Sequence, residues 1–144
     1  MSNFVYKRLK HVDKHIDELE SLRALCFDLD EKNMSSYYKN GILNDNMVAY
    51  VCTDDNNIVG AAYVSDSLYS LYIEQLFVHP DYRLNNIGSN IMKLLLNDKK
   101  YLEEKYNRLF SISSLEDYTN SDFYKKLGYK EYNGLMRTLK KKLY

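Results

Sequence analysis

An apolar run of eight residues, LYIEQLFV, constrains the fold of this chain more than any other feature. The run, Leu71–Val78, is typical of a central strand that is covered on both faces. Pro80 ends it, because proline cannot donate into a sheet ladder. A helical pattern follows Gly88 and continues to about Tyr106, and the next strand is predicted at Arg108–Ser113. This strand–helix–strand crossover predicts a mixed α/β sheet.

The segments on either side of the crossover complete a single expected domain, residues 1–144. Those before it are a strand at Phe4–Leu9, a helix from Asp13, a weaker helix over about Lys32–Lys39 that stops at Asn40-Gly41, and strands at Met47–Cys52 and Ile58–Val64 joined by the hairpin sequence TDDNN. Those after it are a short helix at Ser121–Leu127 and strands at Tyr129–Tyr132 and Leu135–Leu139, which flank the turn Asn133-Gly134. The expected order is β-α-α-β-β-β-α-β-α-β-β.

The charge balance and the cysteines narrow the class of protein. The chain has 20 basic and 20 acidic side chains, without the basic excess that nucleic-acid binders carry. No apolar run approaches the 18 residues of a membrane span, and the N-terminus has no apolar signal core. Cys26 and Cys52 lie in apolar contexts typical of buried thiols in a reducing compartment. We therefore expect a cytoplasmic protein that binds neither nucleic acid nor membrane.

The stretch between the central strand and the following helix, VHPDYRLNNIGSNIMKLLL, has the composition of an anion site. The first amides of a helix have no intrahelical partner, and the helix dipole makes them locally positive. Gly88 allows close approach to the backbone, and Arg83 adds a cation. A pyrophosphate suits such a cradle. A plain strand-to-helix loop with a packing glycine is the alternative on this stretch alone.

Two motifs resemble those of the GNAT superfamily of N-acetyltransferases. The acetyl-CoA signature of that family is Arg or Gln, two residues, Gly, one residue, then Gly or Ala, after a strand that ends in V-x-P-x-x. Its positions are matched here by Val78, Pro80, Tyr82, Arg83, Ile87 and Gly88. The run SDFYKKLGYK, Ser121–Lys130, resembles the C-terminal motif Phe-Tyr-x-x-Leu-Gly-Phe/Tyr. The first glycine of the signature is replaced by Asn86, the non-glycine residue that best tolerates a left-handed backbone.

The resemblance implies a fold and a cofactor. It implies a single mixed-sheet GNAT-like domain whose central strands splay around acetyl-CoA, which is a co-substrate, with no metal. A backbone N–H near Val78 would polarise the thioester carbonyl. Residues expected to contact the pantetheine arm and the pyrophosphate are Leu76, Phe77, Val78, Arg83, Leu84, Asn85, Asn86, Ile87, Gly88 and Ser89, and Asn120 lies near the place of a CoA-contacting asparagine in many relatives.

The resemblance also implies catalytic roles. Tyr124, by its position in the second motif, would protonate the leaving thiolate, and a helix aromatic without a catalytic role is the alternative. Glu74 is the candidate general base: it is expected on the same strand face as Leu76 and Val78, and a carboxylate in an apolar strand is costly without a partner or a task. A structural ion pair or hydrogen-bond anchor is its alternative. His79 is a weaker candidate base.

The acceptor is less determined by the sequence. The segment CFDLDEKNMSSYY offers Asp28, Asp30 and Glu31 for a cationic amine and Tyr37 and Tyr38 as walls, although a solvated acidic loop is the favoured reading. The leading hypothesis is an N-acetyltransferase that acts on a small-molecule amine in a ternary complex. The alternatives are a peptide or protein N-acetyltransferase and a non-catalytic acyl-CoA-binding module. Dimers are common in the family, so a homodimer is one candidate assembly.

Overall fold

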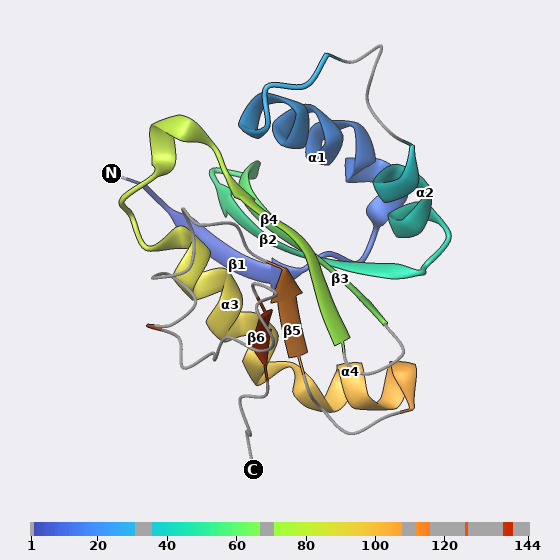
Figure 1. Cartoon of the computed structure of the whole chain (residues 1–144). Helices are drawn as coiled ribbons and strands as arrows, with labels where there is room; N and C mark the ends of the chain where they lie inside the picture. Colours follow the sequence, from blue (N-terminus) through green and yellow to red (C-terminus); the bar gives the residue numbers. More distant parts are fainter. Residues whose placement is uncertain are drawn as a thin grey trace.

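One six-stranded sheet organises the molecule (Figure 1). The computed structural model describes residues 2–30, 36–66, 71–107, 112–115, 126 and 137–139. In these ranges β4 and β5 are parallel, and every other neighbouring pair is antiparallel. The predicted mixed α/β sheet is therefore confirmed. Its strands lie in chain order: β1 (Phe4–Arg8), β2 (Met47–Asp54), β3 (Asn57–Asp66), β4 (Leu71–Val78), β5 (Ile112–Leu115) and β6 (Arg137–Leu139).

Helices cover both faces of this sheet (Figure 1). On one face lie α1 (Val12–Cys26) and α2 (Tyr37–Leu43); α3 (Ile87–Asn97) lies on the other and is followed by α4 (Lys99–Tyr106). Because β2 and β3 lie between the two helical layers, they are buried along almost their whole length. No helix in the described ranges is both long enough and apolar enough to cross a membrane.

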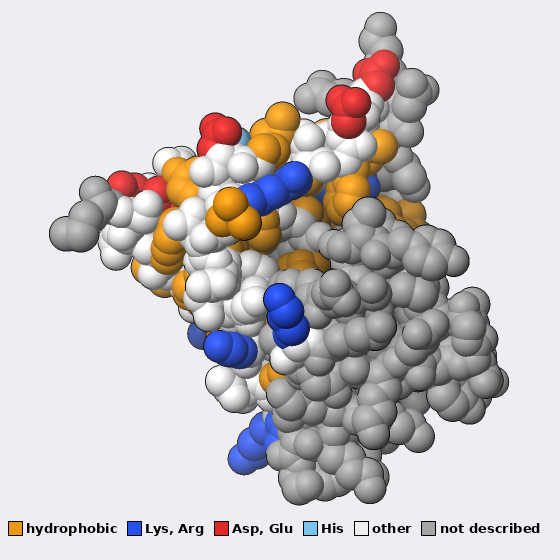
Figure 2. All heavy atoms as spheres, turned by 60° about the vertical axis from the view of Figure 1, so that its left-hand side comes forward, with side chains coloured by type: hydrophobic (Ala, Val, Ile, Leu, Met, Phe, Trp, Pro, Cys, Tyr) orange, Lys and Arg blue, Asp and Glu red, His pale blue; other side chains and the backbone are white. Residues whose placement is uncertain are grey.

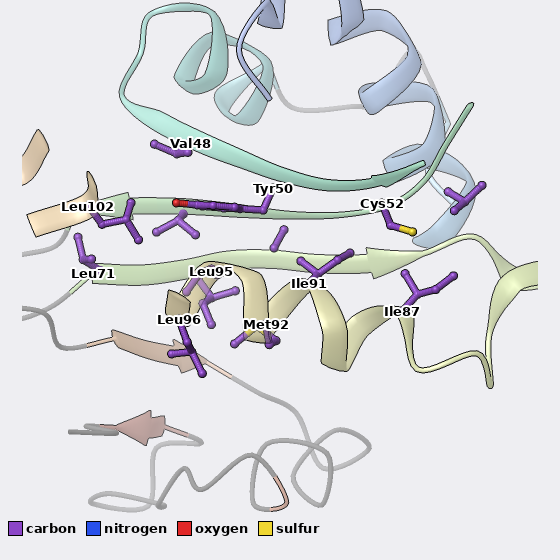
Figure 3. Close-up of a cluster of buried hydrophobic side chains, with 14 residues drawn as sticks. Val48, Tyr50, Cys52, Leu71, Ile87, Ile91, Met92, Leu95, Leu96 and Leu102 are labelled. Carbon is purple, nitrogen blue, oxygen red and sulfur yellow. The ribbon is translucent and has the colours of Figure 1, made fainter. Parts of the chain in front are cut away.

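Alternating side chains divide the core into two clusters. From β2, Tyr50 and Cys52 point toward α3, whereas Ala49 and Val51 point toward α1 and α2. Figure 3 shows the α3 cluster, in which the helix directs its apolar stripe at the sheet. Leu71 and Ile73 join this cluster, and Phe77 joins the other. β4 is thus an interior strand with side chains buried on both faces, as predicted.

The sequence TDDNN forms the predicted hairpin between β2 and β3. Asp54 pairs with Asn57, and the two residues between them, Asp55 and Asn56, have φ of 49° and 71°. Two successive positive φ values are what a two-residue type I′ turn requires, and Asp and Asn tolerate them.

The end predicted for the second helix is wrong, while its predicted start lies outside the described residues. We expected it to stop at Asn40-Gly41, but α2 continues to Leu43 with Gly41 inside it. The reason is packing: a Cβ on Gly41 would lie 2.9 Å from the Cε of Met47. The glycine therefore lies inside the helix, against the flexible side chain of Met47, and does not end it.

The long helix predicted up to Tyr106 is also wrong, because it breaks at Asp98. Arg8 Nη1 and the Tyr50 hydroxyl both donate to Asp98 Oδ2, at 2.6 and 2.7 Å. These contacts hold the junction of α3 and α4 against β1 and β2. The strand predicted at Arg108–Ser113 is described only from Ile112, as β5, because residues 108–111 lie outside the described residues. The elements expected at 121–127 and 129–132 lie outside the described residues, except for Lys126, which is helical.

Candidate functional site

In the part of the chain that the structure describes, the pairing of β4 with β5 covers the first part of β4. Leu71–Ile73 pair with residues 112–114, and β5 ends at Leu115, whereas β4 continues to Val78. The N–H of His79 donates to Val59 on β3, so alternation directs the backbone groups of Phe77 toward β3 and those of Leu76 and Val78 away from it. Within the described residues, the ladder leaves the second half of β4 without a pairing strand on its β5 side. This is the divergence that the resemblance implies.

A β-bulge at Glu74 changes which residues share a face. Tyr63 pairs with Gln75 and Val64 with Ile73, so Glu74 is the extra residue on β4. Leu76 packs against the α3 cluster, whereas Glu74 is bonded to Tyr37 of α2. The prediction that Glu74 shares a face with Leu76 and Val78 is therefore wrong, since strict alternation does not survive a bulge.

The carboxylate of Glu74 has two described hydrogen-bond donors. The hydroxyls of Ser65 and Tyr37 donate to Oε1 at 2.7 and 3.1 Å. Burial and this carboxylate raise the pKa of Tyr37, which therefore stays a donor at neutral pH. Two neutral donors leave the negative charge of Glu74 without a counter-ion among these contacts, so the carboxylate can pair with an ammonium group.

Glu74 lies in the wall of an open pocket of about 820 Å³. The pocket lies between α2, the adjoining ends of β3 and β4, and the end of α4. Lys105 Nζ contacts one of its carboxylates, that of Asp45, at 2.8 Å. The polar lining combines carboxylates with phenols: Asp45, Asp66, Glu74, Tyr37, Tyr72 and Tyr106. Such a surface suits a cationic ligand that also carries hydrogen-bonding groups.

The loop between β4 and α3 has an unusual backbone. Leu84 and Asn86 both adopt the left-handed region, with φ of 68° and 59°, and Leu84 is fully exposed. A left-handed leucine costs about 1–2 kcal/mol. Asn86 is the N-cap of α3 and makes no side-chain capping bond, so the first amides of the helix are left for another acceptor. The αL conformation explains why asparagine can replace the signature glycine.

Side chains of the loop hold it in place. Asn85 Nδ2 donates to the carbonyls of Tyr82 and Arg83, and the Tyr82 hydroxyl donates to Asp54 at 2.9 Å. His79 Nδ1 accepts from the N–H of Asp81 and caps the short 3-10 turn at Pro80–Tyr82. His79 therefore has a structural task.

Figure 2 shows the face of the molecule on this side, where hydrophobic side chains are exposed among scattered Lys and Arg side chains.

The carbonyl of Val78 accepts two hydrogen bonds. Arg83 Nε and the thiol of Cys26 each donate to it at 3.3 Å. Burial raises the pKa of the Cys26 thiol, and the nearby Arg83 opposes part of that effect. Cys52 is buried as predicted, while Cys26 is only half-buried. Arg83 thus connects the end of β4 to the loop that precedes α3.

Some predicted site residues fall outside the described part of the chain, and others lie away from the pocket. Tyr124, Asn120 and Glu31 lie outside the described residues. Asp28 and Asp30 are described and exposed, and neither lines the pocket at Glu74. Of the predicted acceptor residues that the structure describes, only Tyr37 lines the pocket.

Sequence reasoning missed a buried polar network beside this pocket. Arg23 and Glu20 of α1 are only 2% and 5% exposed and form an ion pair at 2.9 Å. The Tyr63 hydroxyl donates to Glu20 at 3.0 Å. A signal was present: two opposite charges, three residues apart, next to the apolar positions Leu19 and Leu22 of the helix.

Comparisons with known proteins bear on this geometry. A family model described as an acetyltransferase (GNAT) domain matches residues 45–131. A search of curated protein sequences gave no significant match. Many solved structures have similar folds, and three of them are described next.

The first is the ribosomal-protein-S18-alanine N-acetyltransferase from Escherichia coli, with a TM-score of 0.70, 13% identity, and coverage of 91% of this chain and 80% of that one. The second is the aminoglycoside N-acetyltransferase AAC(6')-Iy in complex with CoA, with a TM-score of 0.71, 16% identity, and coverage of 94% and 93%. The third is an aminoglycoside acetyltransferase from an uncultured soil metagenomic sample in complex with trehalose, with a TM-score of 0.66, 22% identity, and coverage of 90% and 91%.

The TM-scores of these three structures show a shared fold, and the family model covers more than half of the chain. The matched region contains the β4–α3 loop with its left-handed Asn86 and extends through the second motif. The resemblance carried by the two motifs is thereby confirmed. The chain belongs to the GNAT family and is an acetyltransferase.

Proposed function

We propose that the protein transfers an acetyl group from acetyl-CoA to a primary amine of a small molecule, by direct attack in a ternary complex. The observation that carries the small-molecule assignment is the open pocket of about 820 Å³ with Glu74 in its wall. Sites for small ligands fall between about 300 and 1,000 Å³. The two aminoglycoside enzymes of similar fold support the same class of acceptor.

The backbone supports acetyl-CoA as the co-substrate. The uncapped start of α3 and the left-handed residues before it leave amides for a pyrophosphate. Those amides belong to Leu84 through Ser89. The backbone groups of Leu76 and Val78 point to the side of β4 where the β5 ladder has ended, as a pantetheine arm requires.

The reaction assigns roles to two side chains. Glu74 accepts a proton from the acceptor ammonium, directly or through water, and the neutral nitrogen then attacks the thioester carbon. The new C–N bond forms, the C–S bond breaks, and the CoA thiolate leaves. Tyr124 gives that thiolate a proton and is reprotonated, directly or through water, by the second proton that the nitrogen loses as it becomes an amide. Backbone amides near Val78 stabilise the oxyanion that precedes the break.

Calorimetric titration tests the cofactor first. Acetyl-CoA is compared with dephospho-CoA and desulpho-CoA, and we expect micromolar binding of acetyl-CoA that weakens when phosphate is removed. A folded sample that binds none of the three contradicts the proposal. An amine panel of aminoglycosides, polyamines, amino-acid derivatives and peptides with free N-termini then separates the acceptor classes.

Two glutamate variants test the role of Glu74. In Glu74→Gln we expect kcat to fall by about 10²-fold with acetyl-CoA binding and melting temperature preserved. Glu18→Gln is the matched control, because Glu18 Oε2 accepts from the N–H of Ile58 away from the pocket. The control should lose stability and keep its kcat. A lower melting temperature with normal specific activity in Glu74→Gln would assign Glu74 a structural role instead.

A further inference from the structure

The buried network on α1 has a geometry that fixes the direction of one guanidinium. Arg23 Nε and Nη2 donate to the two carboxylate oxygens of Glu20, at 2.9 and 3.2 Å. The ring of Tyr38 covers the guanidinium, 4.6 Å from its carbon. A bidentate pair under an aromatic ring allows the plane of the guanidinium little freedom. Its remaining nitrogen, Nη1, is directed at Gln75 Oε1, 3.5 Å away.

This network surrounds the bulge of β4. Gln75 is the next residue after the bulged Glu74, and its partner across the strand pair is Tyr63. The hydroxyl of Tyr63 donates to Glu20, so both sides of the pair Tyr63–Gln75 are attached to the same two charges of α1. The register shifts immediately after this pair.

A buried ion pair of this kind is weak evidence for stability. Apolar side chains of similar volume often replace such pairs without loss, whereas the pair can specify one arrangement among several. A strand pair whose register shifts has an obvious competing arrangement: a slip by one residue moves each side chain to the other face. Such a slip would take Glu74 out of the pocket wall. The network opposes it, because Gln75 must stay on the α1 face to reach Arg23.

We propose that the Arg23–Glu20 pair, acting through Gln75 and Tyr63, is a positioning device that holds the β4 bulge in register and thereby keeps Glu74 directed into the acceptor pocket. The role in acetyl transfer rests on the proposed function, whereas the role in holding the bulge does not. Arg23, Glu20 and Gln75 are positioning residues, since none of them lines the pocket.

A second network of the same composition, on the opposite face, supplies the control. Arg8 pairs with Asp98 at 2.6 Å, the Tyr50 hydroxyl donates to the same carboxylate, and the Arg8 guanidinium carbon lies 3.5 Å from the centre of the Tyr101 ring. Each network contains one arginine, one carboxylate, one donating phenol and one covering phenol. The network on α1 is almost fully buried and reaches the bulge, whereas the Arg8 and Asp98 side chains are 25% and 24% exposed and lie away from the bulge.

The experiment compares three variants with the wild-type protein. The double variant Glu20→Gln/Arg23→Met removes both charges together, so no unpaired charge stays buried. Gln75→Met leaves the ion pair and removes only its link to β4. Arg8→Met/Asp98→Asn is the matched control for the exchange rates; its kcat is not compared, because Asp98 also anchors α3. Hydrogen exchange of the backbone amides in residues 72–78 reports on the bulge without any substrate, and steady-state kinetics with the best amine of the panel reports on catalysis.

We expect amide exchange in residues 72–78 to rise at least about tenfold in the α1 double variant and in Gln75→Met, and to stay at the wild-type rate in the control. We expect kcat to fall by about 10- to 100-fold in the same two variants, the effect of a displaced catalytic group, with KM for acetyl-CoA unchanged. Combining the two changes should add little to either one alone, because both break the same link.

Unchanged exchange in Gln75→Met, in a protein that melts normally, overturns the proposal. An equal rise of amide exchange in the α1 variants and the control overturns it too, since the effect is then one of general stability. Faster exchange with full kcat overturns the catalytic role of the bulge. If the wild-type protein acetylates no amine of the panel, the proposed function has failed, and the exchange rates alone decide whether the network holds the bulge.

Discussion

Gly60 of β3 is the point at which the sheet meets the start of α3, and Gly60→Ala tests that contact. A Cβ at this position would lie 2.9 Å from Ile87 Cγ2 and 3.2 Å from Ile91 Cδ1. Ile87 is the first residue of α3, directly after the left-handed Asn86. One added methyl group therefore pushes on the residue whose amide belongs to the cofactor loop.

The expected size of the effect is the difference of two contributions. Overpacking a tight core contact costs about 1–3 kcal/mol. Alanine regains about 0.5–1 kcal/mol, because glycine loses more backbone entropy on folding and no positive φ is needed at Gly60. The net loss is about 1 kcal/mol, which lowers the melting temperature by about 4 °C in a chain of this length. We also expect acetyl-CoA to bind roughly threefold more weakly, which corresponds to about 0.7 kcal/mol.

Gly41→Ala is the matched control, measured by the same thermal melts and acetyl-CoA titration. Its Cβ would also lie 2.9 Å from a neighbour, but that neighbour is the flexible end of Met47, which can move aside. It is also a helix position, where alanine is favoured by about 1 kcal/mol over glycine. The control should melt at or above the wild-type temperature and bind acetyl-CoA normally. If Gly60→Ala behaves like Gly41→Ala, the tight contact with Ile87 does not limit the loop.

Three further predictions follow from other parts of the molecule. Asn86→Gly should bind acetyl-CoA at least as well as the wild-type protein. Asn86→Val should bind it more weakly and lose about 1–2 kcal/mol of stability, because a β-branched residue resists a positive φ. Calorimetry measures the binding, and urea denaturation measures the stability. Burial raises the pKa of Tyr50 and Tyr63 above 10.0. The folded protein keeps protons that the unfolded chain releases above about pH 10, so stability is unaffected below that pH and falls above it, by about 1.4 kcal/mol per pH unit for each tyrosine. Tyr63→Phe should remove one such contribution in urea denaturation between about pH 9 and 11, and an unchanged slope would contradict the burial argument. In Tyr124→Phe, kcat should fall by about 10²-fold with cofactor affinity preserved, and an unchanged kcat would rule out its role as the acid.

Features that are determined by short stretches of sequence could be predicted. The hairpin TDDNN, the apolar strand β4 and the loop ending at Gly88 each depend on residues close together in the chain, and the structure has all three. Asn86 could be placed in a left-handed conformation because few other residues tolerate one.

Features that depend on contacts between distant residues could not be predicted. The bulge at Glu74 arises from pairing with β3, and period-two alternation carries no sign of it. The break at Asp98 needs Arg8 and Tyr50, which are 90 and 48 residues away in the chain. The acceptor pocket is assembled from α2, β3, β4 and α4, so no single stretch of sequence describes it.

The break at Asp98 has a consequence for the loop at the opposite end of α3. The last turn of the helix is anchored by Asp98 to β1 and β2, and its first residue is packed against Gly60. Because α3 is held at both ends, it can neither translate along the sheet nor rotate on it. The positive φ values of Leu84 and Asn86 therefore cannot be relieved by a shift of α3. The conformation of the loop is therefore fixed when the chain folds. A ligand that fits this conformation binds without a large free-energy cost for ordering the loop.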